Sequence, residues 1–153
     1  MYSRQDFIEF ILDHYENPRN HGPLSPASIA MKGGNPGCGD IITLYLRIHS
    51  DTQVIEEITF TGEGCTISQA AASLTTTYIK GQSLAFVRTW GASDLLEDLG
   101  PSVMRSRRRC ATLALHTLRA ALTQYLQNNS SLAPVTPDDE KEVGILQFEA
   151  QTS

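Results

Sequence analysis

The first stretch with helical periodicity covers residues 3–16. Its apolar residues share one helical face: Phe7, Ile8, Ile11, Leu12 and Tyr15. Ser3 and Asp6 stand three positions apart, a spacing that is typical of a capping box, in which each side chain pairs with the backbone N–H of the other residue. Asn17-Pro18 then ends the pattern. The sequence therefore predicts an amphipathic helix followed by a loop.

Two later stretches have the period of two that is typical of strands. In residues 41–49, apolar side chains fill alternate positions: Ile42, Leu44, Leu46 and Ile48. A turn at Ser50-Asp51-Thr52 leads to a second strand from Val54 to Phe60. We expect the two strands to pair as an antiparallel hairpin, with a shorter third strand around Ile29 to Lys32.

Helical patterns dominate the rest of the chain. Helices are expected over residues 66–80, from Ser83, from Ser93, and over residues 106–127. The order of helix, hairpin and helices predicts an α+β fold, with a small antiparallel β-sheet of about three strands covered by helices. Residues 1–127 would form the domain, and residues 128–153 a polar, flexible tail with a short extended piece at 145–148.

Composition removes several classes of function. The chain has 153 residues, 41% of them hydrophobic, and a net charge of −5, so we expect one folded domain that does not bind nucleic acid, because that class needs a basic surface. No apolar run approaches the roughly 20 residues that a membrane-spanning helix needs, and the N-terminus lacks the layout of a signal peptide. We expect a cytoplasmic protein without a membrane partner.

The cysteines are the first candidates for chemistry. There are three of them, and an odd number in a reducing compartment argues against a disulfide framework. Cys38 is separated by a single glycine from Asp40, so a thiolate and a carboxylate could converge on one ion. Taken alone, this motif could equally be a glycine-rich turn around a buried cysteine.

The other two cysteines lie at predicted helix starts. Cys65 follows Gly62-Glu63-Gly64 at a strand-to-helix junction, where a helix N-terminus favours a thiolate. Cys110 follows three arginines, residues 107–109, which are either a solvated basic face or a counterweight to local negative charge. Three thiolates and one carboxylate form a plausible tetrahedral set for zinc, and thiolates also suit iron–sulfur clusters.

These motifs, in this order, resemble the U-type iron–sulfur scaffold family, which comprises IscU, SufU and the NifU N-terminal domain. The resemblance runs from about Phe7 to Leu126. Its motifs are Tyr15-Glu16-Asn17-Pro18-Arg19-Asn20, Asn35-Pro36-Gly37-Cys38-Gly39-Asp40, the stretch from Gly62 to Ser68, Lys80-Gly81-Gln82-Ser83-Leu84, and Cys110-Ala111-Thr112-Leu113.

The resemblance implies a SufE/NifU-like fold and a ligand set of Cys38, Asp40, Cys65 and Cys110 for Zn²⁺ or a [2Fe–2S] cluster. It also implies two kinds of partner: a pyridoxal-phosphate-dependent cysteine desulfurase that supplies sulfur as persulfide, and apo iron–sulfur proteins that accept clusters. Some members of the family build and pass on a cluster, whereas others bind zinc and act mainly as sulfur acceptors. Both roles stay open here, as do the oligomeric state and the role of the tail.

Three features depart from the family's patterns. IscU-type members carry a histidine where this chain has Arg109, and a basic residue before Cys110 looks like the SufU type. SufU members usually carry an insertion, for which the 44 residues between Cys65 and Cys110 leave no room. Residues 99–103 read Leu-Gly-Pro-Ser-Val in place of the Leu-Pro-Pro-Val-Lys chaperone-recognition stretch, so docking of an Hsp70-type chaperone is doubtful.

For the sulfur acceptor we predict Cys38, because it lies in the most flexible, glycine-flanked loop; an IscU-like protein would favour Cys110. We predict that Asp40 is the ligand that leaves most readily. A structural zinc module is the alternative from another class, although the chain has no Cys-x-x-Cys knuckle. The four histidines receive structural interpretations first: His14, His21 and His49 as surface residues, and His116 as too far along its helix to join Cys110.

Overall fold

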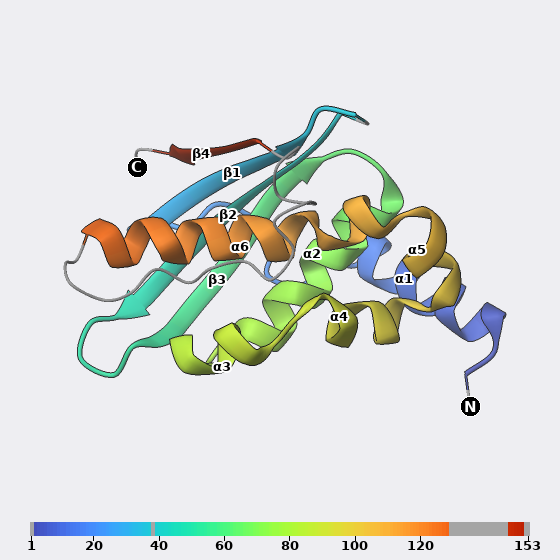
Figure 1. Cartoon of the computed structure of the whole chain (residues 1–153), viewed down its shortest axis with the longest axis horizontal. Coiled ribbons are helices and arrows are strands. Elements are labelled where there is room, and N and C mark those ends of the chain that lie inside the picture. The colour runs from blue at the N-terminus through green and yellow to red at the C-terminus, as the bar shows by residue number, and fades with distance from the viewer. Residues whose placement is uncertain (1, 38, 129–146, 152–153) are drawn as a thin grey trace.

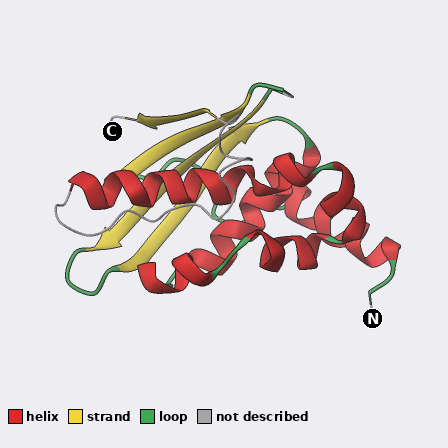
Figure 2. Ribbon diagram, viewed as in Figure 1, coloured by secondary structure: helices red, strands yellow, loops and turns green. Residues whose placement is uncertain are grey.

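The computed structural model describes residues 2–37, 39–128 and 147–151. Its elements are α1 (Arg4–Glu16), β1 (Ile29–Asn35), β2 (Asp40–His49), β3 (Val54–Glu63), α2 (Thr66–Ile79), α3 (Leu84–Thr89), α4 (Ala92–Leu99), α5 (Pro101–Ser106), α6 (Arg108–Asn128) and β4 (Gln147–Gln151). The fold is α+β, as predicted, with the helices gathered on one side of an antiparallel sheet (Figures 1 and 2). None of the helices in the described ranges has both the length and the apolar character that crossing a membrane requires.

The sheet has the strand order β3-β2-β1-β4, and every neighbouring pair is antiparallel. The predicted hairpin is the β2–β3 pair, and β1 lies on the other side of β2, so that Asn35 pairs with Asp40 across a four-residue turn. Strand β4 adds one more strand than the sequence indicated, since Gly33 of β1 pairs with Phe148. The prediction of a domain followed by a flexible tail stays a prediction, because residues 129–146 and 152–153 lie outside the described part.

The alternation along β2 decides which side chains enter the interior. Asp40 belongs to the buried series of this strand, which continues with Ile42, Leu44, Leu46 and Ile48. Helix α6 packs against β1 and β2 on this face, and it comes very close to β1 at Gly33, where an added Cβ would collide with the hydroxyl of Thr117. The sequence therefore places a carboxylate at the end of a strand that is otherwise apolar on its inner side.

Helix α1 begins with the predicted capping box, in which Ser3 and Asp6 exchange hydrogen bonds. Its buried face differs from the expected one, because Ile8 and Leu12 are 40% and 42% exposed while Ile11 and His14 are buried. The expectation that His14 is a surface residue is therefore wrong. Its Nδ1 lies 2.8 Å from the hydroxyl oxygen of Ser73 on α2, so a hydrogen bond satisfies the ring in the interior. The prediction from periodicity considers only the positions of apolar residues, so it does not reveal a polar partner such as Ser73.

The second half of the chain contains five helices in the described residues, one more than expected. Ser83 caps α3 as predicted, whereas α4 starts at Ala92 with Gly91 as its cap, because the Asp94 carboxylate accepts the Gly91 N–H. The unexpected helix is α5, which begins at Pro101. Proline lacks an N–H and its fixed φ suits the first turn of a helix, so Pro101 starts a helix between the two that the sequence predicts from Ser93 and over residues 106–127.

Candidate metal centre

Three of the four expected ligands converge in space. Each of Asp40, Cys65 and Cys110 offers one ligand atom, and these atoms all lie within 4.8 Å of one another. They come from the start of β2, the cap of α2 and the first turn of α6. Cys38, the fourth, lies outside the described residues, and its role stays a prediction. Segments that are far apart in the sequence thus bring two thiols and a carboxylate to one place.

Asp40 is the innermost of these groups, with 1% of its surface exposed. The backbone N–H of Cys65 donates to Asp40 Oδ1 at 2.8 Å, and the Cys65 thiol lies 3.5 Å from Oδ2. The two hydrogen bonds hold the carboxylate against the end of β3 and the start of α2. A buried carboxylate needs such partners or a cation, because removing its charge from water is costly.

Cys65 is the cap residue of α2. Its backbone is extended, with φ −71° and ψ 161°, and its sulfur accepts the N–H of Ser68 at 3.5 Å. The Ser68 hydroxyl donates back to the Cys65 carbonyl at 3.0 Å. N–H groups at a helix N-terminus favour negative charge on the atom that they face. The structure confirms the predicted position of Cys65 at the start of α2, and its role as a ligand stays a prediction.

Gly64 makes the close approach of Cys65 and Asp40 possible. Its φ is +140°, which side-chain-bearing residues rarely adopt, and a Cβ built there would lie 2.8 Å from Asp40 Cγ and closer still to Oδ1. The sequence indicated only that Gly62-Glu63-Gly64 ends a strand. In the structure, Gly64 also makes room for Asp40, because the carboxylate fills the space that a side chain at residue 64 would occupy.

Cys110 reaches the site from α6 and is 5% exposed. Its position depends on the packing of α6 across the sheet, for which the close contact of Gly33 and Thr117 sets the spacing. Arg109, which stands where IscU-type proteins are expected to carry a histidine, is exposed rather than buried beside the thiol. Its guanidinium therefore lies at the surface, next to the buried donor group but outside it.

The donor chemistry of this group fits a metal ion. An ionised carboxylate and two thiolates only accept hydrogen bonds, so they cannot face each other within a few ångströms without a cation between them. Here a thiol proton links Cys65 to Asp40. A divalent ion that displaced the protons of both thiols would have two sulfur donors and one oxygen donor around it, which are ligands that zinc accepts. One position remains for a fourth ligand, and Cys38, two residues before Asp40, is the predicted one.

The other histidines do not join this group within the described residues. His21 is exposed and packs its ring against Phe60, while His49 accepts the N–H groups of Asp51 and Thr52. The prediction that His49 lies on the outer face of its strand agrees with its partial exposure. Each of these rings has a structural role in the fold.

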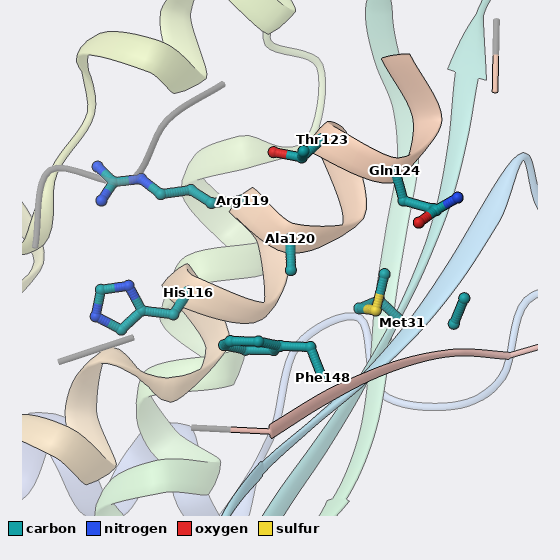
Figure 3. Close-up of a pocket in the computed structure, with 8 residues that line it drawn as sticks. Met31, His116, Arg119, Ala120, Thr123, Gln124 and Phe148 are labelled. Atoms are coloured by element: carbon teal, nitrogen blue, oxygen red, sulfur yellow. The ribbon is translucent and has the colours of Figure 1, made fainter. Parts of the chain in front are cut away.

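His116 lines a different pocket of about 270 Å³, between α6 and strands β1 and β4. Figure 3 shows His116 and Arg119 extending from α6 away from Met31, while Phe148 of β4 covers the helix. Arg119 donates to the carbonyl of Trp90 at 3.2 Å. No cysteine or carboxylate is among the described lining residues, so this pocket lacks the chemistry of the metal centre.

Comparison with known proteins identifies relatives of this chain. IscU of Aquifex aeolicus, an iron–sulfur cluster assembly scaffold protein, is 33% identical over 121 residues, covering 79% of this chain and 76% of the relative. The zinc-dependent sulfurtransferase SufU of Bacillus subtilis is 35% identical over 135 residues, covering 77% and 90%.

Solved structures of other proteins share this fold. The SufU-type protein of Fervidobacterium islandicum AW-1 superposes with a TM-score of 0.61 at 29% identity, covering 78% of this chain and 95% of the other. The N-terminal domain of a NifU-like protein from Brucella abortus, at 16% identity, shares the fold with a TM-score of 0.69, covering 84% and 100%. Residues 6–131 match the model of the NifU-like N terminal domain, and the chain belongs to that family.

Proposed function

We propose that this protein works in iron–sulfur cluster assembly, where it accepts sulfur from a cysteine desulfurase and holds zinc or a [2Fe–2S] cluster through Cys38, Asp40, Cys65 and Cys110. The observation that carries the proposal is the convergence of Asp40, Cys65 and Cys110 within 4.8 Å. A site built only for structure has no need of a carboxylate that is already hydrogen-bonded to a neighbouring thiol. Because Cys65 donates hydrogen bonds to Asp40, the carboxylate can leave a metal and still be hydrogen-bonded in the interior.

Sulfur transfer requires a thiolate on this chain and a persulfide on the desulfurase. The thiolate attacks the outer sulfur of the persulfide, a new S–S bond forms on the acceptor, and the desulfurase cysteine leaves as a thiolate. Asp40 Oδ2 lies where it can take the proton that Cys65 gives up when its sulfur becomes a ligand. A bound zinc ion would hold the thiolates ready and protect them from oxidation.

We assign the acceptor role to Cys38, with Cys110 as the alternative. The residues on both sides of Cys38, Gly37 and Gly39, are exposed, and Gly39 has a φ of +75°. Cys110 is 5% exposed, so a protein-borne persulfide would have less room to reach its sulfur. This difference in access supports the assignment, which rests on the neighbours of Cys38 and not on its own position.

A zinc-dependent sulfurtransferase without a scaffold role is the second candidate. Two observations favour it: the set of thiols and one carboxylate suits zinc, and Arg109 stands where the family's IscU-type members carry histidine. Passing on a cluster and passing on sulfur use the same residues, so the species that the site holds decides between the two functions.

The deciding experiment is to measure metal and acid-labile sulfide on protein purified without oxygen, with and without a cysteine desulfurase, L-cysteine and Fe²⁺. Stoichiometric zinc, no cluster and faster desulfurase turnover would identify the sulfurtransferase. Iron and sulfide in equal amounts, transferable to an apo-protein, would identify the scaffold. Tightly held zinc that resists chelators and does not affect the desulfurase would indicate a structural module. Absence of both metal and cluster under all conditions would refute the proposal.

A further inference from the structure

A surface pocket of about 450 Å³ opens beside the metal centre and has Cys110 as one of its lining residues. The rest of its lining is Asn35 and Gly37 from the β1–β2 connection, and Arg105, Ser106, Arg107, Arg108 and Arg109 from the junction of α5 and α6. An occupant of this pocket would touch the same cysteine that faces Asp40 and Cys65. Four arginines in one pocket next to a cysteine of the candidate metal centre require an explanation.

Neutralising the buried ligands does not explain them. Arg105, Arg107 and Arg109 are exposed, whereas Asp40 and Cys110 are 1% and 5% exposed. Exposed charges are screened by water and salt, so their effect on a buried donor group is small, while their effect on an approaching charged molecule is large. These three exposed arginines therefore act mainly outward.

The helix dipole does not favour an arginine at this position. Arg109 lies in the first turn of α6, where the positive end of the dipole disfavours cations. Residues 99–128 contain no Asp or Glu, so this stretch of the sequence carries positive charge with no acidic residue between. Arginines that are exposed here are better placed to attract an approaching molecule than to stabilise the helix.

We propose that this arginine pocket, residues 105–109 with Asn35 and Gly37, is the docking site for an acidic segment of the protein that exchanges sulfur or cluster at Cys110. The inference rests on the proposed function and adds to it the chemistry of the partner. Four of the chain's twelve lysines and arginines fall within these five residues, although the whole chain carries −5. An acidic partner is repelled by most of this molecule and attracted here, which orients it toward Cys110.

The shape of the pocket favours a peptide over a small anion. A small anion is held by donors that converge on one point, as in an oxyanion or phosphate site. Here the described arginines spread over the end of one helix and the start of the next, and three of them are exposed. Their planar guanidinium groups suit several carboxylates placed along a segment.

The first test uses the full chain and a fluorescein-labelled hexaglutamate peptide, whose binding is followed by fluorescence anisotropy. Replacing Arg105, Arg107 and Arg109 together by glutamine should raise the Kd by at least about tenfold, since each lost charge weakens attraction to the peptide. Replacing the same three by lysine should lose far less. The matched control changes Arg47, Lys80 and Arg88 to glutamine, which alters the net charge equally and should change the Kd by less than about twofold.

Bound hexaglutamate should also slow alkylation of Cys110 by iodoacetamide, measured by mass spectrometry of the peptides, and higher salt should abolish the protection. Equal weakening in the two glutamine variants would mean attraction by net charge alone, and equal binding of hexaglutamine would exclude acidic recognition; either result overturns the proposal. Thermal melting of each variant checks that it is folded.

The second test identifies which partner docks. With the arginine-to-glutamine variant, the concentration needed for half-maximal effect should rise while the maximal rate is kept, either for stimulation of the cysteine desulfurase or for cluster transfer to an apo-acceptor. No change in either assay would overturn the docking role. If the unaltered protein binds hexaglutamate but neither accepts sulfur nor holds a metal or cluster, the proposed function is refuted. That outcome differs from failure of the docking proposal, in which sulfur and metal chemistry are present but the arginines have no effect.

Discussion

The backbone N–H of Cys65 donates a 2.8 Å hydrogen bond to Asp40 Oδ1, and this contact joins the start of β2 to the cap of α2. It gives the carboxylate a partner that does not depend on a metal. Under the proposed function, Asp40 detaches from a bound cluster and stays hydrogen-bonded in the interior, which is the property expected of a ligand that leaves during transfer.

From this contact we predict that Asp40→Ala slows the release of a bound cluster, because the variant has no oxygen ligand whose departure opens a position for the acceptor's thiol. The half-life of the cluster during transfer to an apo-ferredoxin should lengthen several-fold. Asp51→Ala, which changes an exposed residue of the turn between β2 and β3, is the control for the lost charge. An unchanged half-life in Asp40→Ala would contradict the role of Asp40.

Gly64 provides a test of the space around Asp40. Gly64→Ala places a methyl group against the Asp40 carboxylate and should weaken zinc binding by at least about tenfold, because a displacement of about 1 Å disrupts a metal site. Gly81→Ala is a matched control, since Gly81 also has a positive φ, +85°, but a Cβ there meets nothing within 4 Å.

Both alanine variants should lose about 1–2 kcal/mol of stability from the positive φ, and Gly64→Ala should lose more than Gly81→Ala because its Cβ also collides with Asp40. Only Gly64→Ala should lose zinc affinity, measured by competition with a chromophoric chelator. Equal zinc affinity of the two variants would mean that the space beside Asp40 does not determine the geometry of the site.

His14 makes the stability of the fold depend on pH. Burial lowers its pKa below 6.5, and the positive charge of Arg19 lowers it further, while Asp13 partly opposes them. The unfolded chain therefore binds a proton more readily than the folded chain does. The contribution of the neutral ring to stability is present above about pH 6.5 and is lost as the pH falls through the lower pKa of the folded state.

Urea unfolding at a series of pH values between about 8 and 5 measures this effect. His14→Gln should flatten the dependence in that window, whereas His21→Gln, which changes an exposed ring, should keep it. His14→Gln should also lower the overall stability, because it removes the buried ring that hydrogen-bonds Ser73 on α2. A pH dependence that persists unchanged in His14→Gln would assign it to other groups.

Local patterns predicted most of this fold because they are set by neighbouring residues. The alternation in residues 41–49 specified β2, and Ser3 with Asp6 specified the start of α1. For β4 the sequence indicated only a short extended piece at 145–148, because the segment Gln-Phe-Glu-Ala-Gln has one large apolar residue. Its pairing with β1 was not predicted, since it is a distant contact that no local pattern records. The inward turn of His14 has the same origin, since Ser73 lies 59 residues away.

The sequence indicated the residues of the candidate site but not how they meet. Cys65 and Cys110 stand at the starts of α2 and α6, as predicted, whereas the role of Cys38 stays a prediction. The meeting of Asp40 with Cys110 depends on how α6 lies across the sheet, and the space for the carboxylate depends on Gly64. The arginines at residues 107–109 were visible as a charge run, but only the structure places them with Arg105 in a pocket at Cys110.

Substitution of the cysteines one at a time identifies which of them accepts sulfur. We expect Cys38→Ser to abolish persulfide formation on this protein when it is incubated with a cysteine desulfurase and L-cysteine, because serine cannot form an S–S bond. Cys110→Ser removes a nearly buried sulfur, so it should lower metal retention but leave more of the sulfur transfer. Cys65→Ser serves as the control for loss of a ligand, since Cys65 caps a helix and hydrogen-bonds Asp40.

Mass spectrometry of the intact protein counts the added sulfur atoms, and peptide mapping locates them. Persulfide on Cys38 in the unaltered protein, lost only in Cys38→Ser, would establish the exposed glycine-flanked loop as the point of entry. Normal transfer in Cys38→Ser together with loss in Cys110→Ser would assign entry to Cys110 instead. In that case the acceptor is the cysteine that lines the arginine pocket, and an acidic partner docked there would present its sulfur directly to it.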